Sequence, residues 1–175
     1  MLNQRNTAII LLLVVIGAGG FYAYRTFGRG TLVLKVEDPP SEWGPASNVF
    51  IQFSEVRVHR ADAGNESGWT VIVDESGWVD LTEALNTSKT LGSESLRAGK
   101  YNLVRFNVSD AKVTVDGDNH TAPVESGFMT VAIIQGGVTI ESGQTSAVTI
   151  DITPRVVPRG VQGYKVVPAT TALPN

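Results

Sequence analysis

One stretch near the amino terminus constrains this chain more than any other. From Ala8 to Tyr24 the sequence carries no charged residue, and arginines stand on both sides of the run. As a helix, the run would rise about 25 Å at 1.5 Å per residue, near the lower limit for crossing the hydrocarbon core of a bilayer. We therefore expect residues 1–29 to be a signal-anchor whose transmembrane helix tethers the rest of the chain.

The same stretch also fits a cleaved secretory signal. In that interpretation Arg5 is the charged start, Ala8 to Ile16 the apolar segment and Gly17 to Gly20 the cleavage zone. The absence of an A-x-A pattern and the aromatic residues between Phe21 and Tyr24, which suit a membrane–water interface, favour the anchor. Both interpretations export the remaining chain, as an anchored domain in one case and a secreted one in the other.

Charge and cysteine content limit what the exported part does. The chain has 14 Lys and Arg against 17 Asp and Glu. Three of the arginines, and no acid, lie in the first thirty residues, so the remainder carries a net charge of −6. This balance disfavours nucleic acid and anionic lipid as partners. With no cysteine, the chain forms no disulfide and has no thiolate metal ligand, so an exported domain must be stable through core packing.

Most of the remaining sequence consists of short runs in which apolar and polar residues alternate, the pattern of half-buried strands. The run from Asn48 to Arg60 changes parity near Ser54-Glu55, which indicates a β-bulge. We expect strands over residues 31–37, 48–60, 69–73, 78–81, 98–108, 112–115, 128–134, 138–140, 147–152 and 164–167.

Polar and glycine-containing segments predict the connections. Asp74–Gly77 is expected to close a hairpin between its two flanking strands, and Asp116-Gly117 to close another after residue 115. Asp80–Glu83 has capping-box spacing and predicts one short helical turn. Residues 86–94 read as a polar loop, and Pro154 is expected to end the strand before it. The fold class is thus all-β: an antiparallel β-sandwich of about eight strands over residues 30–168, followed by a flexible tail over 169–175.

Several short motifs follow one another along the chain: Gly30–Val36 with Asp38-Pro39, Val56–His59, Trp69, Val79–Leu81, Ala98–Tyr101 and Val166–Pro168. In this order they resemble the DUF4382 family of exported bacterial and archaeal domains. The resemblance runs from Gly30 to about Pro168. It implies a β-sandwich at the cell surface and no established activity. Bacterial relatives are commonly lipoproteins, and the missing cysteine here favours a membrane helix as the tether and is compatible with an archaeal source.

Asn-x-Ser/Thr sequences mark candidate glycosylation sites, and they favour a domain outside the cytoplasm. Three lie in expected loops or turns and one on the polar face of a strand, where a glycan is accommodated. The four asparagines are Asn65, Asn86, Asn107 and Asn119.

Asp110, Asp116, Asp118 and Asn119 offer the oxygen ligands that Ca²⁺ prefers. The alternative is that the Asp-Gly pair simply makes a hairpin turn. The segment departs from an EF-hand loop, since no acid stands at the twelfth position and no helices are expected around it.

The aromatic residues and histidines give weaker signals. Trp43, in a loop with Pro and Gly, is the candidate for an exposed ligand-binding ring, whereas Trp69 and Trp78 are expected to cover the end of the core. His59 and His120 have no partner at metal-ligand spacing and are expected to be solvated and without function.

No sequence motif for a nucleophile, a metalloprotease or a phosphate-binding loop is present, and only a glycosidase-type pair of carboxylates is left open. We therefore expect no enzyme. Two hypotheses remain. The first is a membrane-anchored structural, adhesive or binding module that contacts an envelope protein or glycan. The second is a self-assembling surface subunit, with or without Ca²⁺, that adds an edge strand or its tail to the next copy.

Overall fold

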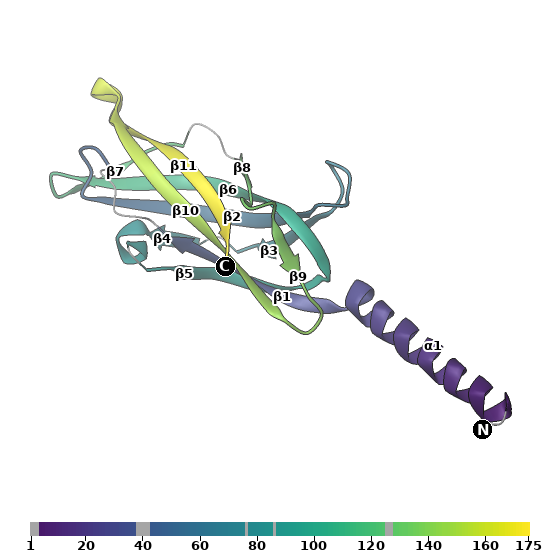
Figure 1. Cartoon of the computed structure of the whole chain (residues 1–175). Helices are drawn as coiled ribbons and strands as arrows, with labels where there is room; N and C mark the ends of the chain where they lie inside the picture. The colour runs from purple at the N-terminus through teal and green to yellow at the C-terminus, as the bar shows by residue number, and fades with distance from the viewer. Residues whose placement is uncertain (1–3, 38–42, 76, 86, 125–127) are drawn as a thin grey trace.

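The computed structural model describes residues 4–37, 43–75, 77–85, 87–124 and 128–175. They form a helix that projects from one end of two β-sheets (Figure 1). The elements are α1 (Gln4–Phe27), β1 (Arg29–Glu37), β2 (Asn48–Arg60), β3 (Trp69–Val73), β4 (Gly77–Asp80), the 3₁₀ helix η1 (Leu81–Ala84), β5 (Lys89–Arg97), β6 (Gly99–Val115), β7 (Asp118–Thr121), β8 (Phe128–Ala132), β9 (Val138–Ile140), β10 (Thr145–Pro158), the 3₁₀ helix η2 (Gly160–Gln162) and β11 (Tyr164–Pro174).

The strands divide into a four-stranded and a seven-stranded sheet. The smaller sheet has the order β11-β10-β1-β5, and the larger one has the order β3-β2-β6-β7, with β4 also on β2 and with β8 and β9 also on β6. The ladders between the described strands are antiparallel except that of β1 with β10, which runs parallel from Thr31 opposite Thr145 to Glu37 opposite Asp151. Two isolated bridges, Val124 with Val166 and Ile133 with Ala172, are also parallel. The prediction of a β-rich domain is confirmed, and the expectation that every neighbour is antiparallel is corrected at these places.

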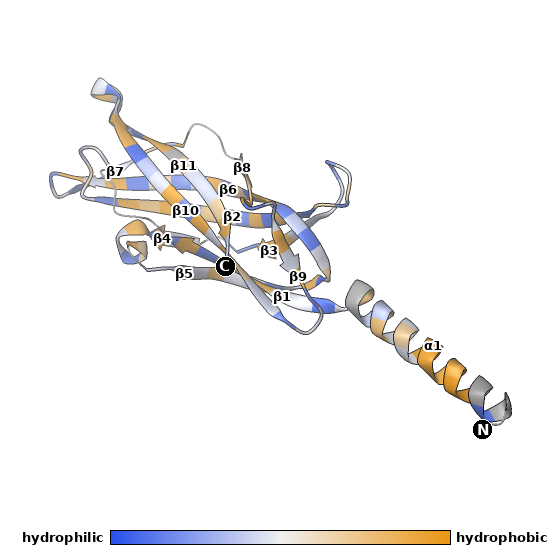
Figure 2. Ribbon diagram, in the orientation of Figure 1, coloured by the Kyte–Doolittle hydropathy of each residue, from blue (hydrophilic) through white to orange (hydrophobic). Residues whose placement is uncertain are grey.

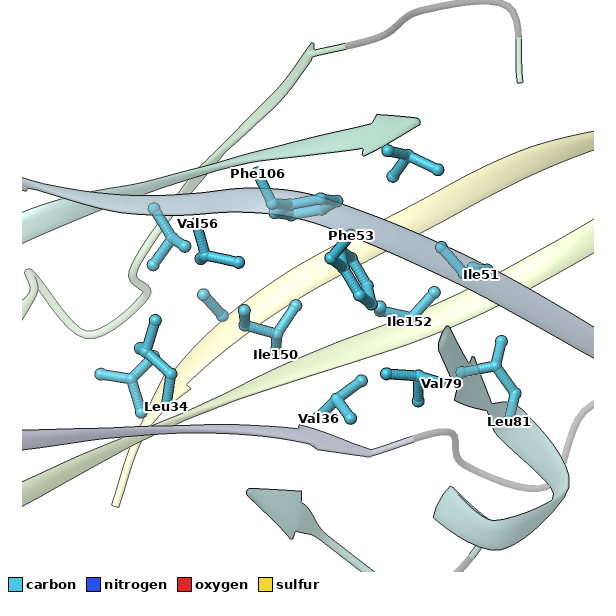
Figure 3. Close-up of a cluster of buried hydrophobic side chains, with 14 of the residues drawn as sticks. Leu34, Val36, Ile51, Phe53, Val56, Val79, Leu81, Phe106, Ile150 and Ile152 are labelled. Atoms are coloured by element: carbon cyan, nitrogen blue, oxygen red, sulfur yellow. The ribbon is translucent and has the colours of Figure 1, made fainter. Parts of the chain in front are cut away.

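The two sheets face each other across one apolar core (Figure 3). β1 supplies Leu32, Leu34 and Val36, each with 0% of its surface exposed, as their alternation predicts. In the middle of the core the rings of Phe53 and Phe106 meet edge to face, with centroids 5.8 Å apart and planes at 74°. Burial of such side chains removes apolar surface from water and holds the sheets together without disulfides.

Two local predictions are confirmed. The register of β2 against β6 shifts around Phe53, so that Ser54 is passed over between Phe53 and Glu55, and this is the expected β-bulge. The bulge restores burial to Val56 after the change of parity. Asp80 caps η1, since its carboxylate accepts a hydrogen bond from the Thr82 N–H at 2.9 Å.

The expected hairpin between β3 and β4 is wrong. Both strands pair antiparallel with the same edge of β2: β3 lies opposite Val56–His59 and β4 opposite Phe50–Phe53. β3 and β4 therefore lie end to end along one edge of β2 and run in the same direction, so the chain does not reverse between them.

Two further expectations fail in the middle of the chain. Instead of the polar loop expected over residues 86–94, Lys89–Arg97 form β5, which pairs with β1 at the edge of the smaller sheet. An edge strand needs backbone pairing more than apolar alternation, and only Leu96 of β5 is buried. The expected break after Val108 is also absent, because β6 runs on to Val115 and the Asp116-Gly117 turn joins it to β7.

The carboxyl-terminal end differs from the prediction as well. β10 continues through Pro154 to Pro158, beyond the last residue of β10 that pairs with β1, Asp151. Pro154 lies opposite Pro168 of β11, so this pair contributes no N–H to the ladder, and β10 and β11 stay in register through the residues on either side of it. The expected flexible tail after Pro168 is corrected, because β11 stays paired with β10 as far as Pro174.

Candidate functional site

The helix joins the two-sheet domain through a short, hydrogen-bonded junction at one end of the sheets (Figure 1). The Tyr24 carbonyl accepts hydrogen bonds from the Gly28 N–H at 2.9 Å and from the Ser142 hydroxyl at 2.5 Å. The Gly28 carbonyl in turn accepts from the Ala98 N–H at 2.7 Å. The last turn of α1 is therefore held by the β9–β10 turn and by the β5–β6 connection.

A cleft of about 370 Å³ opens beside this junction. The α1 side of its wall is aromatic, with Phe21 and Tyr24, and the domain side includes Ile140, Glu141 and Ser142. Its volume lies at the lower end of the range for small-molecule pockets. The cleft brings together a helix and a turn that are more than one hundred residues apart in the sequence.

Arginines gather at the same end of the domain, around the buried ring of Tyr101. Burial raises the pKa of the Tyr101 hydroxyl, and the nearby guanidinium groups of Arg60, Arg29 and Arg97 oppose that rise. Arg60 is compensated by Asp62, with two hydrogen bonds of 2.7 and 2.8 Å, and this contact lowers the pKa of the Asp62 carboxyl. The domain-side end of α1 is thus a basic environment.

Upstream of the junction, α1 is apolar and exposed. The orange half of the helix in Figure 2 contains Ile9 to Ile16, whose side chains are between 49% and 66% exposed. Phe21, Tyr22, Tyr24 and Phe27 follow with exposures between 57% and 70%. Within the described residues, no helix combines the length and the apolar character that crossing a membrane requires.

A second cleft, of about 300 Å³, lies between the edges of the two sheets. Its inner wall includes the core residues Phe53 and Val79, and its rim includes Trp78, Glu75 and Lys89. This cleft opens between the end of β3 and the start of β4, beside the edge strand β5. This cleft has an apolar floor and one side chain of each charge at its mouth.

The outer face of the larger sheet carries two stacked pairs of a cation and an indole. The Arg105 guanidinium lies 4.3 Å from the Trp69 ring, and the Lys112 ammonium lies 4.3 Å from the Trp78 ring. Trp78 is 39% exposed, and Trp69 is half-buried. These rings lie on the outside of the sheet, so the expectation that they cover the end of the core is corrected. A Trp43 exposed for a ligand is also wrong, since that ring is 6% exposed and belongs to the core.

His59 is buried rather than solvated. It is 4% exposed, and its Nε2–H donates a 3.0 Å hydrogen bond to the Gly64 carbonyl, which fixes the proton on that nitrogen. Its ring packs 4.8 Å from that of Trp69. His120 is half-buried, with its ring 5.1 Å from Tyr164. Both histidines therefore have packing roles that the sequence pattern did not indicate.

The structure does not bring the proposed calcium ligands together. Asp110 and Asp116 lie six residues apart along one extended strand and the turn after it, and the Asn119 amide oxygen accepts a hydrogen bond from the Thr114 hydroxyl at 2.8 Å. Among the described residues, no three acidic or histidine side chains form a group that could hold a metal ion. Asp116-Gly117 has the positive φ angles, 51° and 90°, of the hairpin turn that joins β6 to β7, beside the exposed Asp118.

The candidate glycosylation sites fall in different surroundings. Asn65, in the β2–β3 loop, and Asn119, at the β6–β7 hairpin, are exposed. Asn107 is half-buried in the middle of β6, opposite Glu55 and Phe128. Asn86 lies outside the described residues.

Sequence reasoning missed the junction cleft and the arginine cluster. Arg29, Arg60 and Arg97 are scattered along the sequence, and no motif connects them. Only the register of β1 with β5 and the position of β2 bring them to one end of the domain.

The fold and the junction define a class: a β-rich domain of two facing sheets carried on an N-terminal helix. A comparison with family models matches residues 29–168 to the family described as "Domain of unknown function (DUF4382)". The chain belongs to this family, as the resemblance predicted. Comparisons with curated proteins and with solved structures give no match.

Proposed function

We propose that this chain is a membrane-anchored protein of the cell envelope whose two-sheet domain lies outside the cytoplasm and has a structural, adhesive or binding role. One observation carries the proposal. Eight consecutive apolar residues, Ile9 to Ile16, are all about half or more exposed on α1. Because successive residues turn by about 100° around a helix, these side chains point in every direction. A helix that is apolar all round is stable where apolar material covers it, as lipid does.

The aromatic residues that follow the apolar run support the same placement. Phe21, Tyr22, Tyr24 and Phe27 lie between the apolar part of α1 and the domain, and all four are exposed. Aromatic rings, tyrosine above all, favour the boundary between hydrocarbon and water, where an apolar body and a polar tip are both satisfied. The rings would thus lie at the membrane surface, with the domain beyond them.

A binding or structural role fits the two clefts better than catalysis does. Among the described residues that line them, the junction cleft has one carboxylate, Glu141, and the cleft between the sheet edges has one, Glu75. Glycoside hydrolysis uses two carboxylates across one bond. The exposed Asn65 and Asn119 are positions at which an exterior domain could carry glycans, and they support the outward orientation.

The test is fractionation of the full chain from native membranes, followed by alkaline carbonate extraction, intact mass measurement and protease treatment of intact cells. We expect the full-length chain to stay with the membrane and its domain to be cleaved from outside. Leu12→Arg should release the chain, because a charge at the centre of an inserted helix costs about 2.5–3.5 kcal/mol. Val161→Arg, at a fully exposed apolar residue of η2, is the matched control and should leave retention unchanged.

Other results would contradict the proposal. A soluble chain shortened by about twenty residues would establish the secreted alternative with a cleaved signal. Protection of the domain in intact cells, with cleavage only after lysis, would place it on the cytoplasmic side.

A second candidate, a self-assembling surface subunit, is favoured by one feature. β5 ends the order of the smaller sheet, and Ser93, Glu94 and Ser95 in it are exposed. An edge strand presents unpaired backbone groups to which another strand can add. Addition of the tail is less favoured, because β11 is already paired with β10.

Sedimentation of the protein over a wide concentration range, with and without Ca²⁺, tests this candidate. Self-assembly predicts oligomers that grow with concentration and that Ser93→Lys weakens, since a lysine on an edge strand opposes strand addition. A monomer at every concentration in both buffers would exclude it.

A further inference from the structure

Two arginines face each other across a strand pair at the end of the domain nearest the helix. Arg29 of β1 and Arg97 of β5 are Cα partners in the antiparallel register, and both side chains are exposed. Directly opposite residues project from the same face with Cβ atoms about 4.5–5.5 Å apart, and like charges there destabilise the sheet. This pair therefore gains stability from a bound anion.

Among the described residues, no carboxylate forms an ion pair with Arg29 or Arg97; Asp62, which is bonded to Arg60, is the carboxylate whose pKa the charge of Arg97 helps to lower. Arg29 donates hydrogen bonds to the carbonyl and the hydroxyl of Ser95, both uncharged. The Arg97 guanidinium lies 5.0 Å from the centroid of the Phe27 ring. Among described residues, the ion pairs are Arg57 with Glu55, Arg60 with Asp62, and Lys89 with Glu83, and none includes Arg29 or Arg97.

The pair lies where α1 leaves the domain. Phe27, beneath the Arg97 guanidinium, ends α1, and only Gly28 separates it from Arg29. If hydrocarbon covers α1 as far as Tyr24, Phe27 lies about 4.5 Å beyond it at helical rise, and the Arg97 guanidinium lies beside the Phe27 ring. A headgroup layer is about 5–8 Å thick on each side of the hydrocarbon core. The two guanidinium groups would thus lie at the depth of the lipid phosphates.

We propose that Arg29 and Arg97 together bind the phosphate group of a phospholipid headgroup in the membrane that α1 enters. The guanidinium fork matches phosphate oxygens with paired, charge-assisted hydrogen bonds, and two such groups on one face can hold one phosphate between them. This inference rests on the membrane attachment proposed above, and it adds the chemistry that fixes the domain against the membrane surface.

The net charge of −6 on the domain does not oppose this site. Charges are screened over about 8 Å at physiological ionic strength. The nearest environment therefore decides, and there Arg60 is already paired with Asp62 while Arg29 and Arg97 are not paired. The sequence-wide balance disfavours anionic lipid for the domain as a whole, whereas this end of the domain suits it.

The test uses the full chain in neutral detergent micelles and measures its thermal unfolding midpoint. One arm adds phosphatidylglycerol, a second adds diacylglycerol with the same acyl chains but no phosphate, and a third adds inorganic phosphate. We expect phosphatidylglycerol alone to raise the midpoint, because a ligand that binds only the folded state stabilises it. Arg97→Gln should weaken the apparent affinity for this lipid about tenfold, and the double variant with Arg29→Gln should abolish the shift.

Arg155→Gln is the matched control, since Arg155 is also exposed and lies ten residues along β10 from the helix-proximal start of that strand. It should keep the full shift. Three results would overturn the inference: an equal shift with diacylglycerol, an equal shift with inorganic phosphate, which would mean a general anion site, or a full shift in Arg97→Gln.

Failure of this inference is distinguishable from failure of the proposed function. If the wild-type chain is found free of membranes after fractionation, the anchor proposal fails, and the headgroup site, which depends on it, fails as well. If the wild-type chain and the arginine variants all stay in the membrane while the lipid shift is unchanged in the variants, only the headgroup site fails.

Discussion

Gly30 offers the sharpest test of how the junction is built. It is the second residue of β1, it is buried, and the β9–β10 turn crosses directly over it. A Cβ atom at Gly30 would overlap the Glu141 carbonyl oxygen and would lie 2.8 Å from that of Gln144 and 2.9 Å from Ile140 Cγ2. Since the φ of Gly30 is one that other residues adopt, the cost of Gly30→Ala is steric only.

The turn cannot retreat freely from the added methyl group. It is held by a hydrogen bond from the Thr31 N–H to the Gln144 carbonyl at 2.8 Å and by another from the Gly143 N–H to the Arg29 carbonyl at 2.9 Å. Overpacking of this kind costs about 1–3 kcal/mol, and loss of one of the two bonds adds about 1 kcal/mol. Alanine also reduces the conformational entropy of the unfolded chain, which offsets about 0.4–1 kcal/mol of this cost.

The net expectation for Gly30→Ala is a loss of about 1–3 kcal/mol in the free energy of unfolding. For a domain of this size, that corresponds to a fall of about 3–10 °C in the unfolding midpoint. Urea unfolding followed by tryptophan fluorescence measures the loss directly. Gly77→Ala is the matched control, because no atom lies within 4 Å of its added Cβ, and it should be neutral or slightly stabilising. Equal stability of the two variants would refute the close crossing of the turn over β1.

Three further predictions concern the aromatic pair in the core, the last strand and the loss of stability at high pH. In a double-mutant cycle with Phe53→Leu and Phe106→Leu, the edge-to-face pair should give a coupling of about 0.5–1.5 kcal/mol, and strict additivity of the two unfolding free energies would contradict it. Truncation after Pro168 removes six register pairs with β10 and should lower the free energy of unfolding by about 2–4 kcal/mol. The lost ladder hydrogen bonds are worth about 1 kcal/mol each, and the entropy cost of ordering these residues offsets part of that sum. Unchanged urea unfolding would mean that this part of β11 adds no stability. Burial raises the pKa of Tyr101, so the unfolded chain loses this proton first, and the free energy of unfolding should fall as pH rises above about 10. Tyr101→Phe should reduce that fall when unfolding is compared at pH 8 and about 11. An identical fall in the variant would exclude Tyr101 as its source.

Local patterns predicted the elements that depend on neighbours in sequence. The alternation of Leu32, Leu34 and Val36 predicts the buried face of β1, because a strand sends successive side chains to opposite faces. The parity change at Ser54 predicts the bulge in β2 for the same reason. Asp80 predicts the cap of η1, because a cap is made between residues two apart.

The misplaced elements depend on neighbours far away. β5 carries little apolar alternation, and it is a strand because β1 supplies its backbone partners. Pro154 remains inside β10 because β1 ends before reaching it and Pro168 faces it from β11. Trp43 follows Pro39 and Pro40 in a polar stretch, yet its ring is buried in the core, and its carbonyl accepts a 3.1 Å hydrogen bond from the N–H of the distant Val156.

The candidate headgroup site shows the same division between sequence and structure. The sequence by itself determined that an uncharged apolar run precedes a β-rich domain with no disulfides, because composition and period are properties of the chain alone. It gave no sign that Arg29 and Arg97, far apart in the chain, would share one face. Only the register of β1 against β5 decided that, because pairing in a sheet depends on which strands fit together across the core, and this fit is settled when the whole domain packs.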